Sequence, residues 1–451
     1  MGNRGITLIV LVVTIVIIII LGGISISLLT GENGVINRTI EAKENMRTGQ
    51  KEEKINLKRI EEIMNDNVEG KTIEQVNDKN PGILEEGSED GTYIINSIED
   101  LVCFSYNVKN GNTYEGKTIK LGIDLDFKST KSYVDAFRTD YGKYGYDENL
   151  LEELTSNKGW EPIGDVANIE QNNFKGIFDG NNKVIYNLYI GKKDIKDVVY
   201  IGMFANNQGT IKNLELKNIK VDTSGGDEVY YFVAGISGNN QGTITNCITD
   251  GIYQSEGNYA LISGITGRNQ GIIEQCTNKA NISGEAMYMA GICAQNLAQI
   301  KKCNNGGEIN SIKSGSYIGG ITGLSNFSNS SIIESFNTAN IVATIDNIYY
   351  GHIGGIVGQT QSNIEWCYNV GDILVSIEST EIACNIGGIA GTLVNILQNC
   401  YSKGTIRIKS INGDVSVGGI IGKFNQGKLK NVYSEKIIEF DGKASVGGES
   451  V

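Results

Sequence analysis

The chain has 451 residues, which is enough for one to three domains and a large buried core. It contains 58 Gly and only 2 Pro, a composition that excludes collagen-like and proline-rich disordered proteins and favours long hydrogen-bonded ladders. The net charge of −13 argues against a nucleic acid partner, and the single histidine, His352, excludes a His-rich zinc site. We therefore expect no metal and no cofactor.

The first predicted element is an uncharged, aliphatic segment from residue 6 to residue 29. A helix with a rise of ~1.5 Å per residue makes this segment long enough to cross a hydrocarbon layer of ~30 Å. Arg4 precedes it and the acidic bulk follows, so the positive-inside rule places the N-terminus in the cytoplasm and the C-terminal domain outside. The alternative is a cleaved signal peptide, whose apolar stretch is usually ~7–15 residues. The sequence favours a single-pass cell-membrane protein with the lipid bilayer as a partner.

The run Arg4-Gly5-Ile6-Thr7-Leu8-Ile9-Val10 resembles the prepilin signal of type IV pilins and pseudopilins. The resemblance implies a leader of residues 1–5, cleavage between Gly5 and Ile6, methylation of Ile6, and prepilin peptidase and pilus or secretion machinery as partners. Ile6 stands where the family usually has Phe. Val10 stands where it usually has the Glu that supports filament assembly, so processing fits the pattern better than polymerisation does.

A charged stem and a linker follow the apolar segment. Residues 30–67 have apolar side chains at helical spacing and predict a thin amphipathic stalk helix, with a partner-binding helix as the alternative. Residues 68–92 contain Asn80-Pro81-Gly82 and an acidic stretch, which is typical of a linker. Ser97 then begins a capping-box-like pattern that predicts a helix over about 97–110. We expect this helix to cover the N-terminal end of the domain spanning residues 93–451.

A self-similar unit dominates the second half of the chain. Successive anchor glycines are separated by 33, 29, 27, 29, 35, 33 and 31 residues. Short apolar runs surround each anchor, and such a unit has no helix with which to bury its own apolar face, so it must stack on its neighbours. The eight anchors are Gly202, Gly235, Gly264, Gly291, Gly320, Gly355, Gly388 and Gly419.

A second recurring slot follows each anchor, usually after twelve residues. Five cysteines occupy it, and the exchange of Cys with other apolar residues indicates that the slot requires burial. We expect stacked free thiols; disulfides between adjacent coils are the alternative, because coil spacing permits them. The occupants assigned to the slot are Leu214, Cys247, Cys276, Cys303, Phe336, Cys367, Cys400 and Val432.

These features predict an all-β fold, a right-handed parallel β-helix of roughly ten coils, preceded by the transmembrane and stalk helix. The repeated Gly-Gly-Ile-x-Gly followed by Asn-Cys-Tyr, clearest at 387–391 and 399–401, resembles the GLUG repeat of bacterial surface proteins. That resemblance implies an adhesin-like surface domain. Glycine suits its tight corners, and asparagine tolerates a left-handed turn and can bond along the stack.

Few residues suggest chemistry. Asp124 and Asp126 would share one strand face, and paired carboxylates can hydrolyse or bind polysaccharide, but we favour a solvent-facing stripe of an alternating strand. His352 has no partner motif, so we expect a turn or surface histidine. Exposed tyrosines such as Tyr349, Tyr350, Tyr368 and Tyr401 are candidate sugar-stacking residues, with packing in the core or in a ladder as the alternative. We assign no catalytic residue.

The sequence thus favours a membrane-anchored, non-catalytic adhesin or minor-pilin-like surface component that binds through its solenoid, with a host or cell-wall glycan as a candidate ligand. Two other functions stay open. One is a carbohydrate-active parallel β-helix enzyme, either a glycoside hydrolase or a polysaccharide lyase. The other is a pilus subunit.

Overall fold

A computed structural model describes residues 91–127, 159–166, 172–226, 229–313, 317–346, 350–378, 383–410 and 414–442. The chain divides into two compact units, Met1–Lys79 and Asn80–Val451, and all described residues belong to the second. The predicted leader (1–5), apolar segment (6–29), stalk (30–67) and nearly all of the linker (68–92) lie outside the described residues. Within the described part, no helix has the length and apolar character needed to cross a bilayer.

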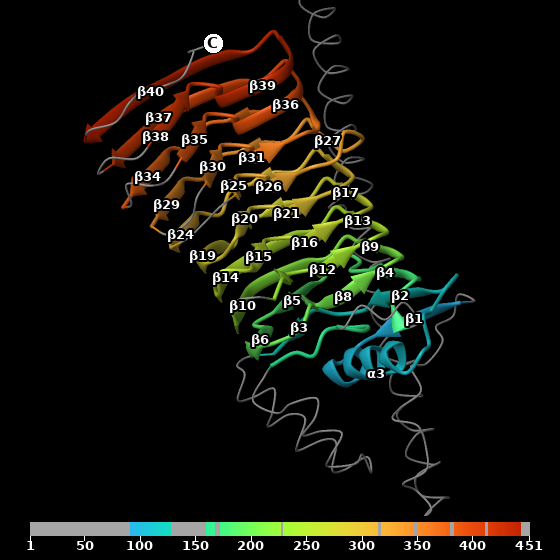
Figure 1. The fold of residues 1–451 in the computed structure, drawn as a ribbon. Helices are drawn as coiled ribbons and strands as arrows, with labels where there is room; N and C mark the ends of the chain where they lie inside the picture. Colours follow the sequence, from blue (N-terminus) through green and yellow to red (C-terminus); the bar gives the residue numbers. More distant parts are fainter. Residues whose placement is uncertain are drawn as a thin grey trace, which may run out of the picture. The chain divides into compact units, whose positions relative to one another are not determined.

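The second unit is a parallel β-solenoid (Figure 1). Its strands form three long sheets, here called A, B and C. The named strands of the described part pair in parallel, for example β12 with β16 and β14 with β19. Eight coils among the described residues run from sheet C to sheet A to sheet B; β1 to β6 add incomplete coils at the N-terminal end. This agrees with the predicted all-β stack of repeated units.

Sheet A has seventeen strands, which are β1 (Thr92–Ile95), β2 (Thr118–Leu121), β4 (Ile177–Asp179), β8 (Phe204–Asn207), β9 (Thr210–Lys212), β12 (Ser237–Asn240), β13 (Thr243–Thr245), β16 (Thr266–Asn269), β17 (Ile272–Glu274), β21 (Cys293–Asn296), β22 (Gln299–Lys301), β26 (Thr322–Ser325), β27 (Ser331–Ile333), β31 (Val357–Thr360), β32 (Asn363–Glu365), β36 (Ala390–Gln398) and β39 (Ile421–Lys430). Sheet B has fifteen, which are β3 (Leu125–Asp126), β5 (Val184–Tyr186), β6 (Tyr189–Ile195), β10 (Glu215–Gly225), β14 (Ile248–Glu256), β18 (Thr277–Asn278), β19 (Asn281–Glu285), β23 (Asn304–Asn305), β24 (Ile309–Lys313), β28 (Phe336–Asn337), β29 (Ile341–Ile345), β33 (Tyr368–Asn369), β34 (Ile373–Ile377), β37 (Tyr401–Ser410) and β40 (Tyr433–Gly442). Sheet C has eight, which are β7 (Val199–Ile201), β11 (Tyr231–Ala234), β15 (Ala260–Ser263), β20 (Tyr288–Ala290), β25 (Tyr317–Gly319), β30 (Tyr350–Gly354), β35 (Ala383–Gly387) and β38 (Asp414–Gly418).

The helix α3 (Ile98–Lys109) covers the N-terminal end of the stack (Figure 1). Its N-cap is Ser97, whose hydroxyl accepts a hydrogen bond from the Asp100 amide at 3.0 Å, the position that the capping pattern indicates. Phe104 points from the helix into the core and is fully buried, with its ring 5.5 Å from Phe174 and 5.8 Å from Phe178. The helix therefore closes the hydrophobic interior where no further coil precedes it.

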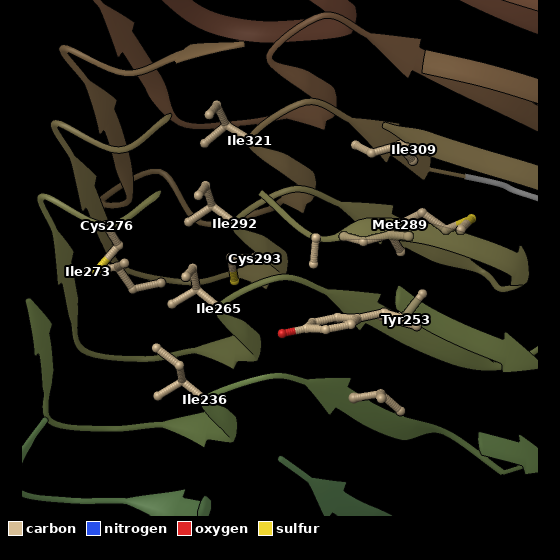
Figure 2. Packing of buried hydrophobic residues seen from close by; sticks show 14 of the residues in the cluster. Ile236, Tyr253, Ile265, Ile273, Cys276, Met289, Ile292, Cys293, Ile309 and Ile321 are labelled. Atoms are coloured by element: carbon tan, nitrogen blue, oxygen red, sulfur yellow. The ribbon is translucent and has the colours of Figure 1, made fainter. Parts of the chain in front are cut away.

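A column of isoleucines, one from each of successive coils, forms part of the core. Ile236, Ile265, Ile292 and Ile321 follow their anchor glycines and lie one above another, each fully buried (Figure 2). Burying an aliphatic side chain of this size contributes roughly 1.5–3 kcal/mol relative to leaving it exposed. Each isoleucine is covered by the coils on both sides, so one coil alone gains little of this energy.

Buried asparagines form two further columns inside the solenoid. In one, the Asn240 amide donates to the Oδ1 of Asn269 at 2.9 Å, and Asn269 donates likewise to Asn296. In the other, Asn278 donates to Asn305 at 2.8 Å, and Asn305 donates to Asn337 at 2.8 Å. Since a buried amide must find partners, and a shift by one residue would turn these side chains outward, the two columns specify the register of the coils.

Candidate functional site

Each coil turns from sheet A to sheet B through one residue in the left-handed conformation. Its backbone amide donates to a carbonyl of the next coil; for example, Asn246 donates to Glu274 at 3.1 Å and Trp366 donates to Gln398 at 3.1 Å. The φ angles of this turn column lie between 51° and 57°. Its members are Asn213, Asn246, Gln275, Lys302, Glu334, Trp366, Asn399 and Asn431.

Asparagine suits this turn column for two reasons. It tolerates the left-handed conformation better than most residues, and its amide can bond along the stack. The Asn246 amide donates to the Oδ1 of Asn213 at 2.8 Å, and Asn431 donates to Asn399 at 2.9 Å. An asparagine here therefore serves the fold.

Neither reason applies to Trp366, which occupies the same turn column. A bulky side chain is disfavoured at a φ of 57°, and 60% of its surface is exposed. Its backbone amide is bonded, but its indole forms no hydrogen bond or ring contact with any residue that the structure describes. The fold gains nothing evident from this ring, which makes Trp366 the leading candidate for a binding residue.

The Trp leaves its neighbour in the next coil with an unused donor. The Oδ1 of Asn399 accepts from Asn431, but its Nδ2 would need an oxygen on residue 366, and tryptophan has none. No described residue accepts from this Nδ2. An exposed aromatic ring and a free amide donor therefore lie on adjacent coils, which are about 4.8 Å apart in a parallel ladder.

A column of aromatic residues runs beside the turn column, on the outer face of sheet B. The rings of Phe336 and Tyr368 stack at 4.7 Å with an interplanar angle of 3°, and those of Tyr401 and Tyr433 stack at 5.7 Å and 10°. Each of these rings has one face covered by its partner, and Tyr368 and Tyr433 are 37% and 59% exposed. The Tyr401 hydroxyl donates to Glu435 at 2.9 Å. This column thus lies beside Trp366, and stacking occupies one face of each of its rings.

The eight anchor glycines lie in one column at the bend between sheets C and A. The Gly264 amide donates to the Gly291 carbonyl at 3.0 Å, and similar bonds link the coils above and below. A Cβ on Gly291 would lie 2.2 Å from the Cγ of Asn305 and 2.4 Å from the Gly320 oxygen. A neighbouring backbone and a buried asparagine thus leave no space for a side chain at this anchor, and the same holds at Gly264, Gly320 and Gly355.

The slot cysteines form another column. Each Sγ donates to the carbonyl two residues earlier, at 3.2 Å in Cys247, 3.3 Å in Cys276 and 3.3 Å in Cys303, and the same contact recurs at Cys367 and Cys400. All eight cysteines of the chain are free thiols, and burial raises the pKa of Cys276 well above its usual value. The burial of these thiols and their bonds to backbone carbonyls indicate that the column is structural.

One predicted slot residue is wrong. Asn304 pairs with Phe336, so the residue level with Cys303 is Ser335, and Phe336 lies on the outer face. Ser335 is fully buried, and its hydroxyl donates to the Ile333 carbonyl at 2.9 Å, which repeats the contact of the cysteines. The longer connection between β26 and β27 displaced the alignment. Leu214 and Val432 do lie in the column, next to Cys247 and Cys400 respectively.

The other candidates for chemistry serve the fold. Asp124 accepts from the Val184 amide at 2.9 Å, and Asp126 accepts from the Asn187 side chain at 2.6 Å. His352 lies in strand β30 and is only 8% exposed, contrary to the expected turn or surface position. Its Nδ1 is 2.8 Å from the Thr392 hydroxyl, and its ring stacks on Tyr317. In the described residues no group of His, Cys, Asp or Glu is arranged to hold a metal ion.

Tyrosines are the candidate sugar-stacking residues that the sequence indicates, and Trp366 is not among them. The signal was present: Trp366 immediately precedes Cys367, and asparagine precedes the slot residue in four of the eight coils. A tryptophan in a column of turn-forming residues is the deviation that marks the site.

No protein-family model matches the chain. One part of the chain is 31% identical over 126 residues to a protein of Evansella cellulosilytica named "Putative Gly-rich membrane protein". The match covers 26% of this chain and 13% of that relative, so the chain spans far less than two thirds of it. Among solved structures, a "putative immunoglobulin A1 protease" from Bacteroides ovatus is 15% identical, with a TM-score of 0.36 over 81% of this chain and 86% of that one. A TM-score this low carries no argument about function.

Proposed function

We propose that the chain is a membrane-anchored cell-surface protein that binds a ligand with its β-solenoid and does not turn it over. It would act as an adhesin or a minor-pilin-like surface component. The observation that carries the proposal is Trp366: the columns of glycine, cysteine and buried asparagine make contacts between coils, whereas this ring is presented to solvent without an evident role in the fold.

Two observations support the cell-surface part of the proposal. Residues 6–29 form an uncharged apolar segment after Arg4, and the partial relative from Evansella cellulosilytica is named as a membrane protein. The resemblances to prepilin signals and to GLUG repeats point the same way, and the latter also implies right-handed coils. In this arrangement the N-terminus is cytoplasmic and the solenoid is outside the cell.

Non-catalytic binding is favoured over carbohydrate cleavage because the paired acids are engaged in the coils. The Asp124 carboxylate accepts a backbone amide and the Asp126 carboxylate accepts the Asn187 side chain, both from the neighbouring coil. An acid–base pair must instead be free to exchange protons with a bound substrate.

The test uses the full chain expressed in bacterial cells. Protease added to intact cells should remove the solenoid, and purified full chain in mild detergent should bind ligands on a glycan array without releasing shorter sugars. A solenoid that external protease never reaches would overturn the surface location. Sugar cleavage that is lost in D124N or D126N would establish the enzyme instead.

A further inference from the structure

The ring of Trp366 and the side-chain amide of Asn399 together form a small polar–aromatic site. The ring is exposed and unstacked, and the Asn399 Nδ2 next to it on the following coil has no acceptor among the described residues. Both groups lie in turns fixed by backbone hydrogen bonds: Trp366 donates to Gln398, and Asn399 donates to Lys430. The site is therefore held in place without a ligand.

We propose that Trp366 and Asn399 form the binding subsite for an uncharged glycan, in which one pyranose ring stacks on the indole and one hydroxyl accepts from the Asn399 amide. This inference rests on the proposed surface-binding function and names its ligand class. The face of an aromatic ring carries negative potential, so the weakly positive C–H groups of a sugar ring pack well against it. A free amide next to that face supplies the directional bond that orients the sugar.

The charges around the subsite favour an uncharged ligand. Glu334, which precedes Trp366 in the turn column, is 3.8 Å from Lys302, and Lys403 on the neighbouring column is 3.4 Å from Glu435. Lys302 and Lys403 thus each have a carboxylate partner. The whole chain carries a net charge of −13, so an acidic glycan would be repelled over longer distances.

A protein partner fits this surface less well. Protein interfaces have a core that is depleted in charged residues and buries about 800 Å² on each side. The turn column around Trp366 instead contains Lys302, Glu334, Asn399 and Asn431, and the aromatic rings beside it are stacked in pairs. One accessible ring face among polar groups matches a single sugar ring.

Intrinsic fluorescence of the full chain in detergent provides a specific readout. The sequence has two tryptophans, and Trp160 is 3% exposed with its indole donating to the Met203 carbonyl, so a ligand in solution reaches only Trp366. The ligands to titrate are cellohexaose, chitohexaose and mannohexaose as uncharged glycans, and oligogalacturonate as the acidic one. We expect at least one uncharged glycan to shift the emission to the blue and to protect it from acrylamide.

The variants remove each proposed binding group while keeping a residue that suits the turn. W366N restores the residue most common in the turn column and should fold at least as well as the wild type, yet bind the glycan at least tenfold more weakly. N399G keeps a residue suited to the left-handed turn but removes the amide, and it should weaken binding severalfold. The control is F327N, which removes a 53% exposed ring on a different turn and should leave binding unchanged.

The outcomes are distinguishable. If a glycan binds and W366N binds it as tightly as the wild type, this subsite is wrong while the proposed surface-binding function stands. If oligogalacturonate binds more tightly than every uncharged glycan, or if a protein ligand and no glycan depends on Trp366, the ligand class is wrong. If neither these sugars nor any array glycan binds, the subsite is wrong, whereas only a solenoid that external protease never reaches overturns the proposed surface location.

Discussion

Replacing Asn305 by alanine should strongly destabilise the solenoid. The side chain is fully buried and makes four hydrogen bonds: it donates to the Asn337 Oδ1 at 2.8 Å and the Gly307 carbonyl at 3.0 Å, and it accepts from Asn278 at 2.8 Å and the Gly307 amide at 3.3 Å. Alanine provides none of these bonds. Asn278 retains its bond to the Ala280 carbonyl at 3.0 Å, so part of the column survives.

The magnitude follows from the groups left without partners. The Asn337 Oδ1 and the Gly307 amide would lose the only hydrogen-bond partners that the described residues give them. An unsatisfied buried polar group costs about 1–3 kcal/mol, so N305A should lower the free energy of unfolding by roughly 2–6 kcal/mol.

The adjacent residue provides the control. Asn304 points to the outer face, and its half-buried side chain donates one bond, to the Thr277 hydroxyl at 3.1 Å. N304A should therefore cost less than about 1 kcal/mol. Guanidinium unfolding of the full chain, followed by circular dichroism in the β-sheet region, measures both variants. Equal losses of stability in N305A and N304A would refute the assignment of a buried, hydrogen-bonded asparagine column.

Two further predictions concern Gly291, at the bend between sheets C and A, and His352, in strand β30. G291A should destabilise the fold by about 1–3 kcal/mol in the same unfolding assay, because its Cβ would meet Asn305 and the Gly320 carbonyl; a stability equal to that of the wild type would remove the steric explanation for the anchors. Burial, with a smaller effect of the Lys423 charge, lowers the pKa of His352 to about 4, below the usual 6.5. The unfolded chain therefore takes up a proton first as the pH falls, and stability present above pH 6.5 should decrease by up to about 3 kcal/mol between pH 6.5 and 4. H352N should reduce this pH dependence, and an unchanged pH profile would contradict the burial of a neutral imidazole.

The sequence predicts the repeating part of the fold because stacking imposes strict demands on a few positions. Gly291 must be glycine where a backbone and an asparagine approach, and Cys276 fills a small buried slot that is bounded by the coils on either side. Such positions recur with the coil length and can be aligned by eye. The capping pattern at Ser97 is equally local, since the bond that it predicts joins residues three apart in sequence.

Other features depend on contacts that the sequence does not display. Ser335 takes the place of a cysteine by making the same bond to a carbonyl, whereas an alignment by hydrophobicity selects its neighbour Phe336. Asn305 resembles a turn residue in the sequence, but the stack turns it inward. Trp366 is exposed and has no packing constraint, so the sequence marks it only by its place in a column where asparagine recurs.

Thiol labelling at positions 335 and 336 tests most directly whether equivalent side chains lie in columns. A thiol buried between coils is shielded from a reagent in solution, whereas a thiol on the outer face is not. When folded full chain is treated with N-ethylmaleimide and its peptides are analysed by mass spectrometry, F336C should be modified at position 336. S335C should be modified at position 335 only after unfolding in guanidinium, because Ser335 is fully buried. Modification of folded S335C and none of folded F336C would contradict the register on which the solenoid and its exposed tryptophan both depend.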